Sequence, residues 1–156
     1  MIFLPEKPEI PPKIHIKAIL RLVPMVQMYY FDTCVWRDYY ENRVGRSGRP
    51  LGTNAARLIM KIIRAKDIIL FSDAVSIELR AAYGPDEVFE MFHTLRLIGV
   101  LKHVEMNTSE IEEAKLVSIS RIVPRWDALH AIIARNNRAI LVSPDKHFNT
   151  LKDIAE

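Results

Sequence analysis

Short apolar runs alternate with longer amphipathic segments along most of the chain. The runs are bounded by polar or turn-forming residues, as buried strands are. They span residues 28–32 (MYYFD), 68–72 (IILFS), 100–106 (VLKHVEM) and 139–143 (AILVS). Strands that are separated by helices are typical of a parallel sheet with helices on both faces. The pattern therefore predicts an α/β fold.

The segments between these runs repeat their apolar residues every three or four positions, which predicts amphipathic helices. We expect these helices at 34–41, 53–67, 76–84, 85–99, 107–123 and from Asp127 onward. Pro85 and Gly99 bound the helix at 85–99, since proline favours a helix start and glycine a helix end. The core side of that helix is predicted to consist of Val88, Phe89, Phe92, Leu95 and Leu97.

Several polar or flexible residues are placed to cap these helices. Thr53 or Asn54 can cap the helix at 53–67, and Gly84 can end the one at 76–84. Ser109 and Glu112 have the spacing of a capping box at the start of 107–123.

Residues 1–27 differ from the rest because they hold five of the nine prolines. Proline favours extended conformations and removes backbone donors. The stretch KIHIKAIL (13–20) alternates apolar and basic residues, which fits an edge strand or an arm on a partner subunit. A loosely attached terminal arm is the simpler interpretation. We therefore predict a proline-rich arm at 1–27, a domain at 28–156, and a homodimer or higher homo-oligomer.

Composition narrows the class of protein. With 156 residues, 49% apolar and 26% charged, the chain is expected to form one globular domain. The net charge of +3 is a mild basic bias that is compatible with a polyanionic partner. A single cysteine, Cys34, excludes an internal disulfide and a cysteine-rich zinc site. The first twenty residues lack an apolar signal core, and charges interrupt the apolar stretches, so we expect a cytoplasmic protein without a membrane span.

Acidic residues stand near the ends of the predicted strands, where sites form in open parallel sheets. Asp32 directly follows the first strand, and Asp145 lies just past the last one. Glu78 lies on the helix that follows the second strand, and Asp127 starts the helix that precedes the last strand. Four carboxylates could therefore converge at one edge of the sheet.

Each acid also has a structural explanation. Asp127 could stabilise a helix N-terminus, Asp145 could be a turn residue, and Glu78 could be a solvated helix residue. Asp32 is the hardest to explain in this way, because an acid after a buried aromatic strand is costly to bury unpaired. The joint placement of all four favours a functional site.

Clustered carboxylates repel one another, and two of them about 4 Å apart cost on the order of 4 kcal/mol at an effective dielectric near 20. Either a bound divalent cation or protonation of some of the acids would relieve this repulsion. An all-oxygen ligand set suits Mg²⁺ or Mn²⁺. Such a cation can activate water and neutralise charge on a phosphate.

The segments around these acids resemble the PIN-domain nucleases, a group that includes VapC-type toxins of toxin–antitoxin pairs. The resemblance spans about residues 28–148 and lies in YYFDTCVW, SIELRAA, PRWDALHAIIA and ILVSPDKHF. It implies a three-layer α/β/α fold with a central parallel sheet, and Mg²⁺- or Mn²⁺-dependent cleavage of RNA. It also implies a protein antitoxin as a partner.

By position, Asp32, Glu78, Asp127 and Asp145 match the acidic site of this family. The resemblance implies that Asp32 and Asp127 bind the metal directly, while Glu78 and Asp145 complete its surroundings or activate water. Ser143 matches a position where the family usually carries Thr or Ser, whose hydroxyl would orient an acid or a water. Thr33 could serve similarly.

Other residues have weaker claims to function. His130 lies one helical turn after Asp127, and a packed or hydrogen-bonded histidine is favoured over a catalytic one. Cys34 is expected to be a small buried residue. Trp126 could stack on a base, although core packing is favoured. The segment NRVGRSGRPLG (42–52) carries three arginines, Arg43, Arg46 and Arg49. It is a candidate phosphate-binding loop and could equally be a solvated basic loop.

The sequence thus predicts a metal-dependent endoribonuclease with a four-carboxylate site, which could be the toxin of a toxin–antitoxin pair. The main alternative is a PIN-fold protein that binds RNA or supports its processing with little or no cleavage. A haloacid-type phosphatase is disfavoured, because the residues after Asp32 (TCVWRD) do not supply the D-x-D motif.

Overall fold

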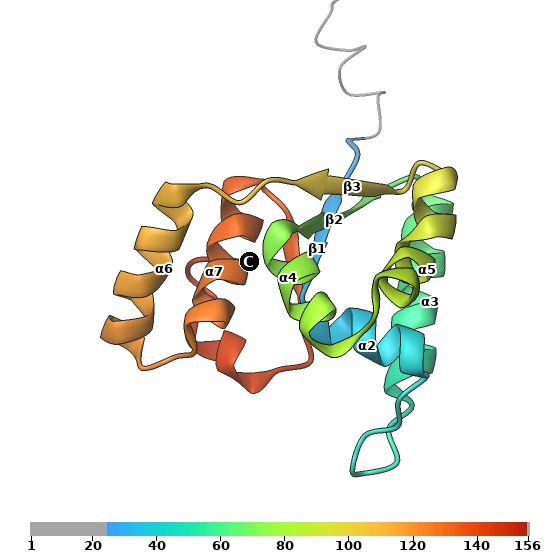
Figure 1. Ribbon diagram of the computed structural model, residues 1–156, viewed down its shortest axis with the longest axis horizontal. Helices are drawn as coiled ribbons and strands as arrows, with labels where there is room; N and C mark the ends of the chain where they lie inside the picture. The colour runs from blue at the N-terminus through green and yellow to red at the C-terminus, as the bar shows by residue number, and fades with distance from the viewer. Residues whose placement is uncertain (1–24, 156) are drawn as a thin grey trace, which may run out of the picture.

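The protein forms one parallel sheet that is flanked by helices in the computed structural model, which describes residues 25–155 (Figure 1). The predicted strand in 13–20, and all of the predicted arm except residues 25–27, lie outside the described residues. Within residues 25–155 the sheet has four parallel strands in the order β3-β2-β1-β4. The strands are β1 (Met28–Phe31), β2 (Ile68–Ser72), β3 (Leu101–Val104) and β4 (Ile140–Val142). In the two central pairings, Tyr30 lies opposite Leu70 and Leu141.

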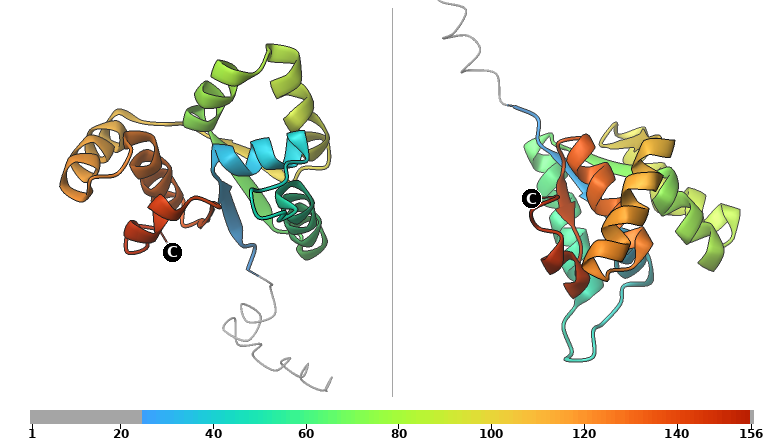
Figure 2. Two further views of the ribbon diagram at one scale, coloured as in Figure 1. Left: turned by 90° about the horizontal axis from the view of Figure 1, so that it is seen from below. Right: turned by 90° about the vertical axis from the view of Figure 1, so that its left-hand side faces the viewer.

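Helices cover both faces of the sheet, which confirms the predicted three-layer α/β/α arrangement. They are α2 (Thr33–Glu41), α3 (Leu51–Ala65), α4 (Asp73–Ala82), α5 (Pro85–Leu97), α6 (Thr108–Arg121) and α7 (Arg125–Asn136), followed by the short 3₁₀ helix η1 (Lys146–Thr150). Two views place α3 and α4 on opposite sides of the strands, and α6 packs against α7 at one end (Figures 1 and 2). No helix in the described part of the chain is both long and apolar enough to cross a membrane.

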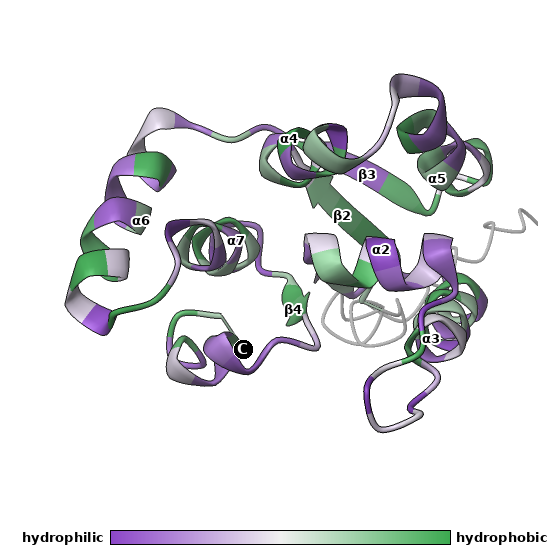
Figure 3. Cartoon of the chain, turned by 60° about the horizontal axis from the view of Figure 1, so that its bottom comes forward, coloured by the Kyte–Doolittle hydropathy of each residue, from purple (hydrophilic) through white to green (hydrophobic). Residues whose placement is uncertain are grey.

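Aromatic side chains fill the core between the sheet and helices α2 and α5. Trp36 is fully buried, and its ring centroid lies 4.8 Å from that of Phe92 and 5.4 Å from that of Phe31. Phe71 extends this cluster, with its centroid 4.5 Å from that of Phe92. The strand β2 is apolar along its length, whereas polar residues lie on the outer surfaces of the helices (Figure 3). This packing fixes the position of Asp32, the first residue after β1.

Several helix ends differ from the sequence prediction. Pro50, not Thr53 or Asn54, is the N-cap of α3, and it makes no side-chain cap bond. Gly84 is the N-cap of α5, and α4 ends before it at Ala82. Capping residues are common near real helix ends, so their spacing alone does not select the right one.

The capping box of α6 is also shifted, by two residues. Asn107 and Glu110 form it, in place of Ser109 and Glu112. Asn107 Oδ1 accepts a hydrogen bond from the backbone N–H of Glu110 at 3.0 Å, and Glu110 Oε2 accepts one from the backbone N–H of Asn107 at 3.0 Å. The same i, i+3 spacing fits both pairs, and the turn after β3 decides between them.

The predicted core also needs correction. Phe89 and Leu97 are exposed on α5, and Met91 is buried there instead. Trp126 is exposed on 40% of its surface, so the favoured interpretation of core packing is wrong for this residue, and Trp36 fills the core. The sheet covers only part of α5, which is why the outer half of its apolar side stays in contact with solvent.

Candidate active site

Asp32 lies at the point where β1 passes into α2, and it is buried. One carboxylate oxygen, Oδ1, accepts a hydrogen bond from the backbone N–H of Cys34 at 2.6 Å, so Asp32 is the N-cap of α2. Its own backbone N–H donates to the carbonyl of Val142 on β4 at 3.1 Å. The sheet and the helix together therefore fix the direction of this carboxylate.

Ser143 connects the ends of β1 and β4. Its hydroxyl donates to Oδ2 of Asp32 and accepts a hydrogen bond from the backbone N–H of Asp145 at 3.0 Å. The sequence prediction placed Ser143 beside an acid, and the structure gives Asp32 as that acid. Ser143 thus links the positions of Asp32 and Asp145.

Glu78 reaches the same region from the middle of α4. Its Oε2 accepts a hydrogen bond from the hydroxyl of Thr33 and lies 2.8 Å from Nε2 of His130. His130 is buried on α7, as expected for a packed or hydrogen-bonded histidine, yet its partner is one of the four predicted acids. Thr33 and His130 therefore hold Glu78 from two different helices.

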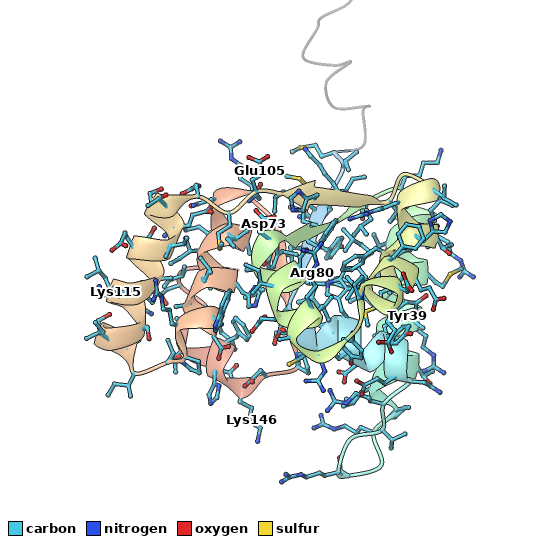
Figure 4. The ribbon with its side chains drawn as sticks, in the orientation of Figure 1. Tyr39, Asp73, Arg80, Glu105, Lys115 and Lys146 are labelled. Atoms are coloured by element: carbon cyan, nitrogen blue, oxygen red, sulfur yellow. The ribbon has the colours of Figure 1, made fainter. Side chains whose placement is uncertain are left out.

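Asp127 and Asp145 both contact His147, a residue that the sequence interpretation did not consider. Nδ1 of His147 lies 3.1 Å from Oδ2 of Asp127 and 3.4 Å from Oδ1 of Asp145. Asp127 is in the first turn of α7, and Asp145 is the N-cap of η1. Ligand atoms of these three residues lie within 4.8 Å of one another, a spacing that a metal ion could bridge. Lys146, between the acid and the histidine, points away at the edge of the molecule (Figure 4).

All four predicted acids line one cavity of about 310 Å³ at the carboxyl ends of β1 and β4. The cavity also brings together two residues that sequence reasoning placed elsewhere or overlooked. Cys34 is only partly buried there, which corrects the expectation of a buried residue, and Arg37 lies at the rim. The complete lining is Asp32, Thr33, Cys34, Arg37, Glu78, Ala81, Asp127, His130 and Asp145.

The three loop arginines do not line this cavity. Arg43 is paired with Asp38 at 3.3 Å, while Arg46 and Arg49 are exposed. Their loop extends away from the body beyond α2 and α3 (Figure 1). Of the basic residues, Arg37 is the one that the structure adds to the cavity, and it also contacts Glu41 at 3.7 Å.

The surroundings shift the pKa values of three of these carboxylates in different directions. Burial raises the pKa of Asp32 and outweighs the hydrogen bond from Ser143. Burial also raises the pKa of Asp127, and the neighbouring Asp145 adds to the effect, while His147 opposes it. For Glu78 burial acts in the same direction, but the hydrogen bonds from His130 and Thr33 prevail and leave its pKa lowered. Asp32 and Asp127 thus carry negative charge that the protein does not fully compensate.

This donor set fits a hard divalent cation. Four carboxylates supply the oxygen ligands that Mg²⁺ and Mn²⁺ prefer, and a cation would remove the repulsion that raises the pKa of Asp127. The fit is therefore chemical as well as geometric, because the cavity holds more acids than bases.

Comparison with known proteins adds one clear finding. No protein-family model matches the sequence, and no curated protein matches it at a significant level. Among solved structures, a chain from the crystal structure of VapBC2 from Rickettsia felis, bound to a DNA fragment from their promoter, matches with a TM-score of 0.55. The match is 14% identical in sequence and covers 83% of this chain and 96% of that chain. The fold is PIN-like.

The PIN-like fold confirms the resemblance and the fold class that the sequence predicted. At 14% identity the likeness concerns the fold, so the chemistry of this chain has to be argued from its own residues. In this PIN-like fold, the cavity lies at the carboxyl ends of parallel strands, where α/β proteins usually bind their ligands.

Proposed function

We propose that the protein is a metal-dependent endoribonuclease that hydrolyses phosphodiester bonds in RNA. The observation that carries the proposal is the cavity in which Asp32, Glu78, Asp127 and Asp145 meet. These acids come from four separate elements, and none of them has a Lys or Arg salt-bridge partner among the described residues. Folding alone poorly explains such a group, because Asp32 is buried and the four acids bring like charges together.

Asp32 and Asp127 are the proposed direct ligands of Mg²⁺ or Mn²⁺, and Glu78 and Asp145 complete the site directly or through water. When bound, the cation supplies positive charge that offsets the carboxylates and the phosphate, and it lowers the pKa of a water molecule. His147 offers one nitrogen ligand next to Asp127 and Asp145.

Side chains of the protein orient the carboxylates and accept a proton from the attacking water. Ser143 and Thr33 donate to Asp32 and Glu78, so they keep these carboxylates aimed into the cavity. Asp145 is the most exposed of the four acids, with 38% of its side chain accessible, and we propose that it accepts the proton of the attacking water. The water then displaces one ester oxygen of the phosphodiester in line.

The decisive experiment compares two acids of the same type. Asp32→Asn should reduce Mn²⁺-stimulated cleavage of a fluorescent single-stranded RNA by on the order of 10²–10³-fold. Asp38→Asn is the matched control, because Asp38 is equally buried but lies outside the cavity. Cleavage by water should also leave no 2′,3′-cyclic phosphate, since the RNA 2′-hydroxyl is not the nucleophile.

Two results would reject the proposal. One is full activity in Asp32→Asn together with chelator-resistant cleavage. The other is RNA binding by the wild-type protein without any cleavage in Mg²⁺ or Mn²⁺, which would favour the RNA-binding or RNA-processing scaffold.

For RNA contacts we propose that Arg37, at the cavity rim, holds a phosphate near the scissile bond, and that Arg43, Arg46 and Arg49 contact more distant phosphates. Replacing Arg37 with Gln should lower the slope of log affinity against log salt by about one, and replacing the three loop arginines should lower it by up to about two to three. Affinity and salt dependence can be measured by fluorescence anisotropy with the Asp32→Asn variant, which leaves the RNA intact. An unchanged slope in either variant would remove that group from the RNA-binding surface.

We further propose that the protein acts as the toxin of a toxin–antitoxin pair, because the PIN-like neighbour belongs to a VapBC2 complex. A protein antitoxin should then be encoded next to this chain, and its co-expression should restore growth that the wild-type protein inhibits. A growth defect that persists in Asp32→Asn would contradict this role. The predicted homo-oligomer can be measured by light scattering on the full chain.

A further inference from the structure

A chain of hydrogen bonds runs from the sheet to Glu78 through the interior of the protein. The hydroxyl of Ser72 lies 2.7 Å from the hydroxyl of Tyr30, which lies 2.7 Å from Nδ1 of His130. Nε2 of the same histidine lies 2.8 Å from Oε2 of Glu78. Ser72 and Tyr30 have no accessible surface and His130 has 2%, so the first three members are shielded from water.

The donors and acceptors of this chain fit one direction of hydrogen bonding. Ser72 accepts a hydrogen bond from the backbone N–H of Val75, so its own hydroxyl hydrogen is free to donate to Tyr30. Tyr30 can then donate to Nδ1 of His130. His130 keeps its hydrogen on Nε2 and donates it to the carboxylate of Glu78.

The reverse direction leaves a buried group unsatisfied. If Nδ1 of His130 donated to Tyr30, the tyrosine would donate to Ser72, and the hydroxyl hydrogen of Ser72 would lose its acceptor. An unsatisfied buried hydroxyl costs about 1–3 kcal/mol. Burial also raises the pKa of Tyr30, which keeps its hydroxyl protonated and able to donate. The direction toward Glu78 is therefore favoured.

The two oxygens of Glu78 are used unequally. Both Thr33 and His130 reach Oε2, and within residues 25–155 Oε1 accepts no hydrogen bond. A glutamate side chain has several rotatable bonds, so two donors on one oxygen hold the carboxylate in one orientation and leave the other oxygen free. Glu78 lines the cavity, where that free oxygen can serve as a ligand.

We infer that Tyr30 and His130 are positioning residues that hold Glu78 ready for the cation, with Ser72 completing the chain. This inference rests on the proposed function, because it concerns the same cation site. Groups that support metal ligands in this way typically change metal affinity or activity by about 10–100-fold when they are removed.

The first test removes one hydroxyl from the chain. Tyr30→Phe keeps the aromatic ring that packs against His130 and should weaken Mn²⁺ binding by about 10–100-fold in calorimetry on the full chain. Tyr29→Phe is the matched control, because the adjacent residue of β1 points to the other face of the sheet. Its Mn²⁺ affinity should equal that of the wild-type protein. A Tyr30→Phe protein that binds Mn²⁺ as the wild type does would overturn the inference.

The second test uses a conservative replacement to separate positioning from packing. His130→Gln retains an N–H donor for Glu78, whereas His130→Leu has a similar bulk without a donor. We expect His130→Gln to bind Mn²⁺ more tightly than His130→Leu by about tenfold or more. Equal affinities in two folded variants would mean that the histidine has only a packing role.

A third measurement needs neither a variant nor a metal. Nitrogen-15 NMR of the metal-free wild-type protein should show His130 protonated on Nε2 and unprotonated on Nδ1. Protonation on Nδ1 would overturn the inference even if every variant failed to fold. If the wild-type protein bound neither Mn²⁺ nor Mg²⁺, the proposed function would fail, and the NMR result would still decide the direction of the chain.

Discussion

The two halves of the candidate site are built differently. Asp32 and Glu78 are held from the protein interior by Ser143, Thr33 and His130, and each acid accepts a side-chain hydrogen bond from a separate element. We call this pair the inner half. Asp127 and Asp145 form the outer half, where the donor between them is His147, whose side chain is 58% exposed.

The two halves therefore differ in how firmly their side chains are held. The inner half has its geometry set by buried groups before any ligand arrives, which is the property expected of a preorganised site. In the outer half Asp145 caps the short helix η1, and both acids contact an exposed imidazole. The atoms of this half can therefore adjust when a cation or a phosphate binds. Substitutions should therefore cost more in the inner half than in the outer one.

The largest contrast should come from replacing one acid of each half. Glu78→Gln should reduce RNA cleavage by on the order of 10²–10³-fold, because no neighbouring carboxylate can take the fixed position of Glu78. Asp127→Asn also removes a proposed metal ligand, but it should reduce cleavage less, because Asp145 and His147 lie beside it and can bind the cation in its place. Single-turnover cleavage rates at saturating Mn²⁺ compare the two.

Glu110→Gln is the matched control for Glu78→Gln, because Glu110 is a buried glutamate that does not line the cavity and glutamine can keep its capping bond. It should cleave RNA at the wild-type rate. Equal losses in Glu78→Gln and Asp127→Asn would contradict the distinction between the two halves.

A smaller effect should appear when the donor of the outer half is changed. His147→Gln should lower RNA cleavage by less than about tenfold, because the supporting contact is exposed to water. If His147 offers its nitrogen to the cation, the same substitution should weaken Zn²⁺ binding more than Mg²⁺ binding, since imidazole is a better ligand for zinc. Calorimetry with both metals measures this difference.

His93→Gln provides the control for His147→Gln, because His93 is an exposed histidine on α5 outside the cavity. It should leave both affinities unchanged. A Zn²⁺ affinity that stays constant in His147→Gln would show that the histidine contacts the two acids without binding the metal.

The smallest effect should be on stability, and it depends on pH. Because the pKa of Asp32 is raised in the folded protein, the folded state holds its proton to higher pH than the unfolded chain does. The free energy of unfolding therefore falls as pH rises through the window between the unfolded value, about 3.9, and the raised folded value. Asp32→Asn has no carboxyl group to ionise at this position, so this fall in the free energy of unfolding is absent. Its Tm should exceed that of the metal-free wild type by a few degrees near pH 7 and by less near pH 4.

Differential scanning calorimetry at several pH values tests this expectation. An excess Tm that shrinks as pH rises would mean that the Asp32 carboxylate is compensated in the folded protein. Saturating Mn²⁺ should reverse the order of stability at neutral pH, because a ligand at 100 times its Kd adds about 2.7 kcal/mol to a folded state that binds it.

Much of the architecture could be read from local patterns. All four strands lie within the predicted apolar runs, and Asp32 and Asp145 follow them as expected. Ser143 was singled out through the resemblance to PIN-domain nucleases, and its hydroxyl donates to Asp32 in the structure. Helix ends were harder, since Asn107 and Ser109 are both suitable caps and only the path of the chain after β3 selects one.

The residues that were misjudged share one property, which is that their roles depend on distant neighbours. His130 was expected to be packed or hydrogen-bonded, as it is, but its partner Glu78 could not be named from the sequence. His147 was overlooked even though it lies two residues after Asp145, and this short spacing was the available signal. Trp126 was expected to pack in the core because tryptophan is large and apolar, whereas its burial depends on which face of α7 the rest of the protein covers.

The sequence by itself determined that strands and helices alternate, and hence that acids at strand ends gather at one edge of a parallel sheet. That result follows from the periods of strands and helices, which are local properties of the chain. Only the tertiary structure decided which atoms meet there. Tyr30 and His130 are 100 positions apart, and Asp32 and Ser143 are 111 apart, so their hydrogen bonds leave no local signal. The orientation of each carboxylate is set by such contacts, because side-chain direction depends on what packs against it.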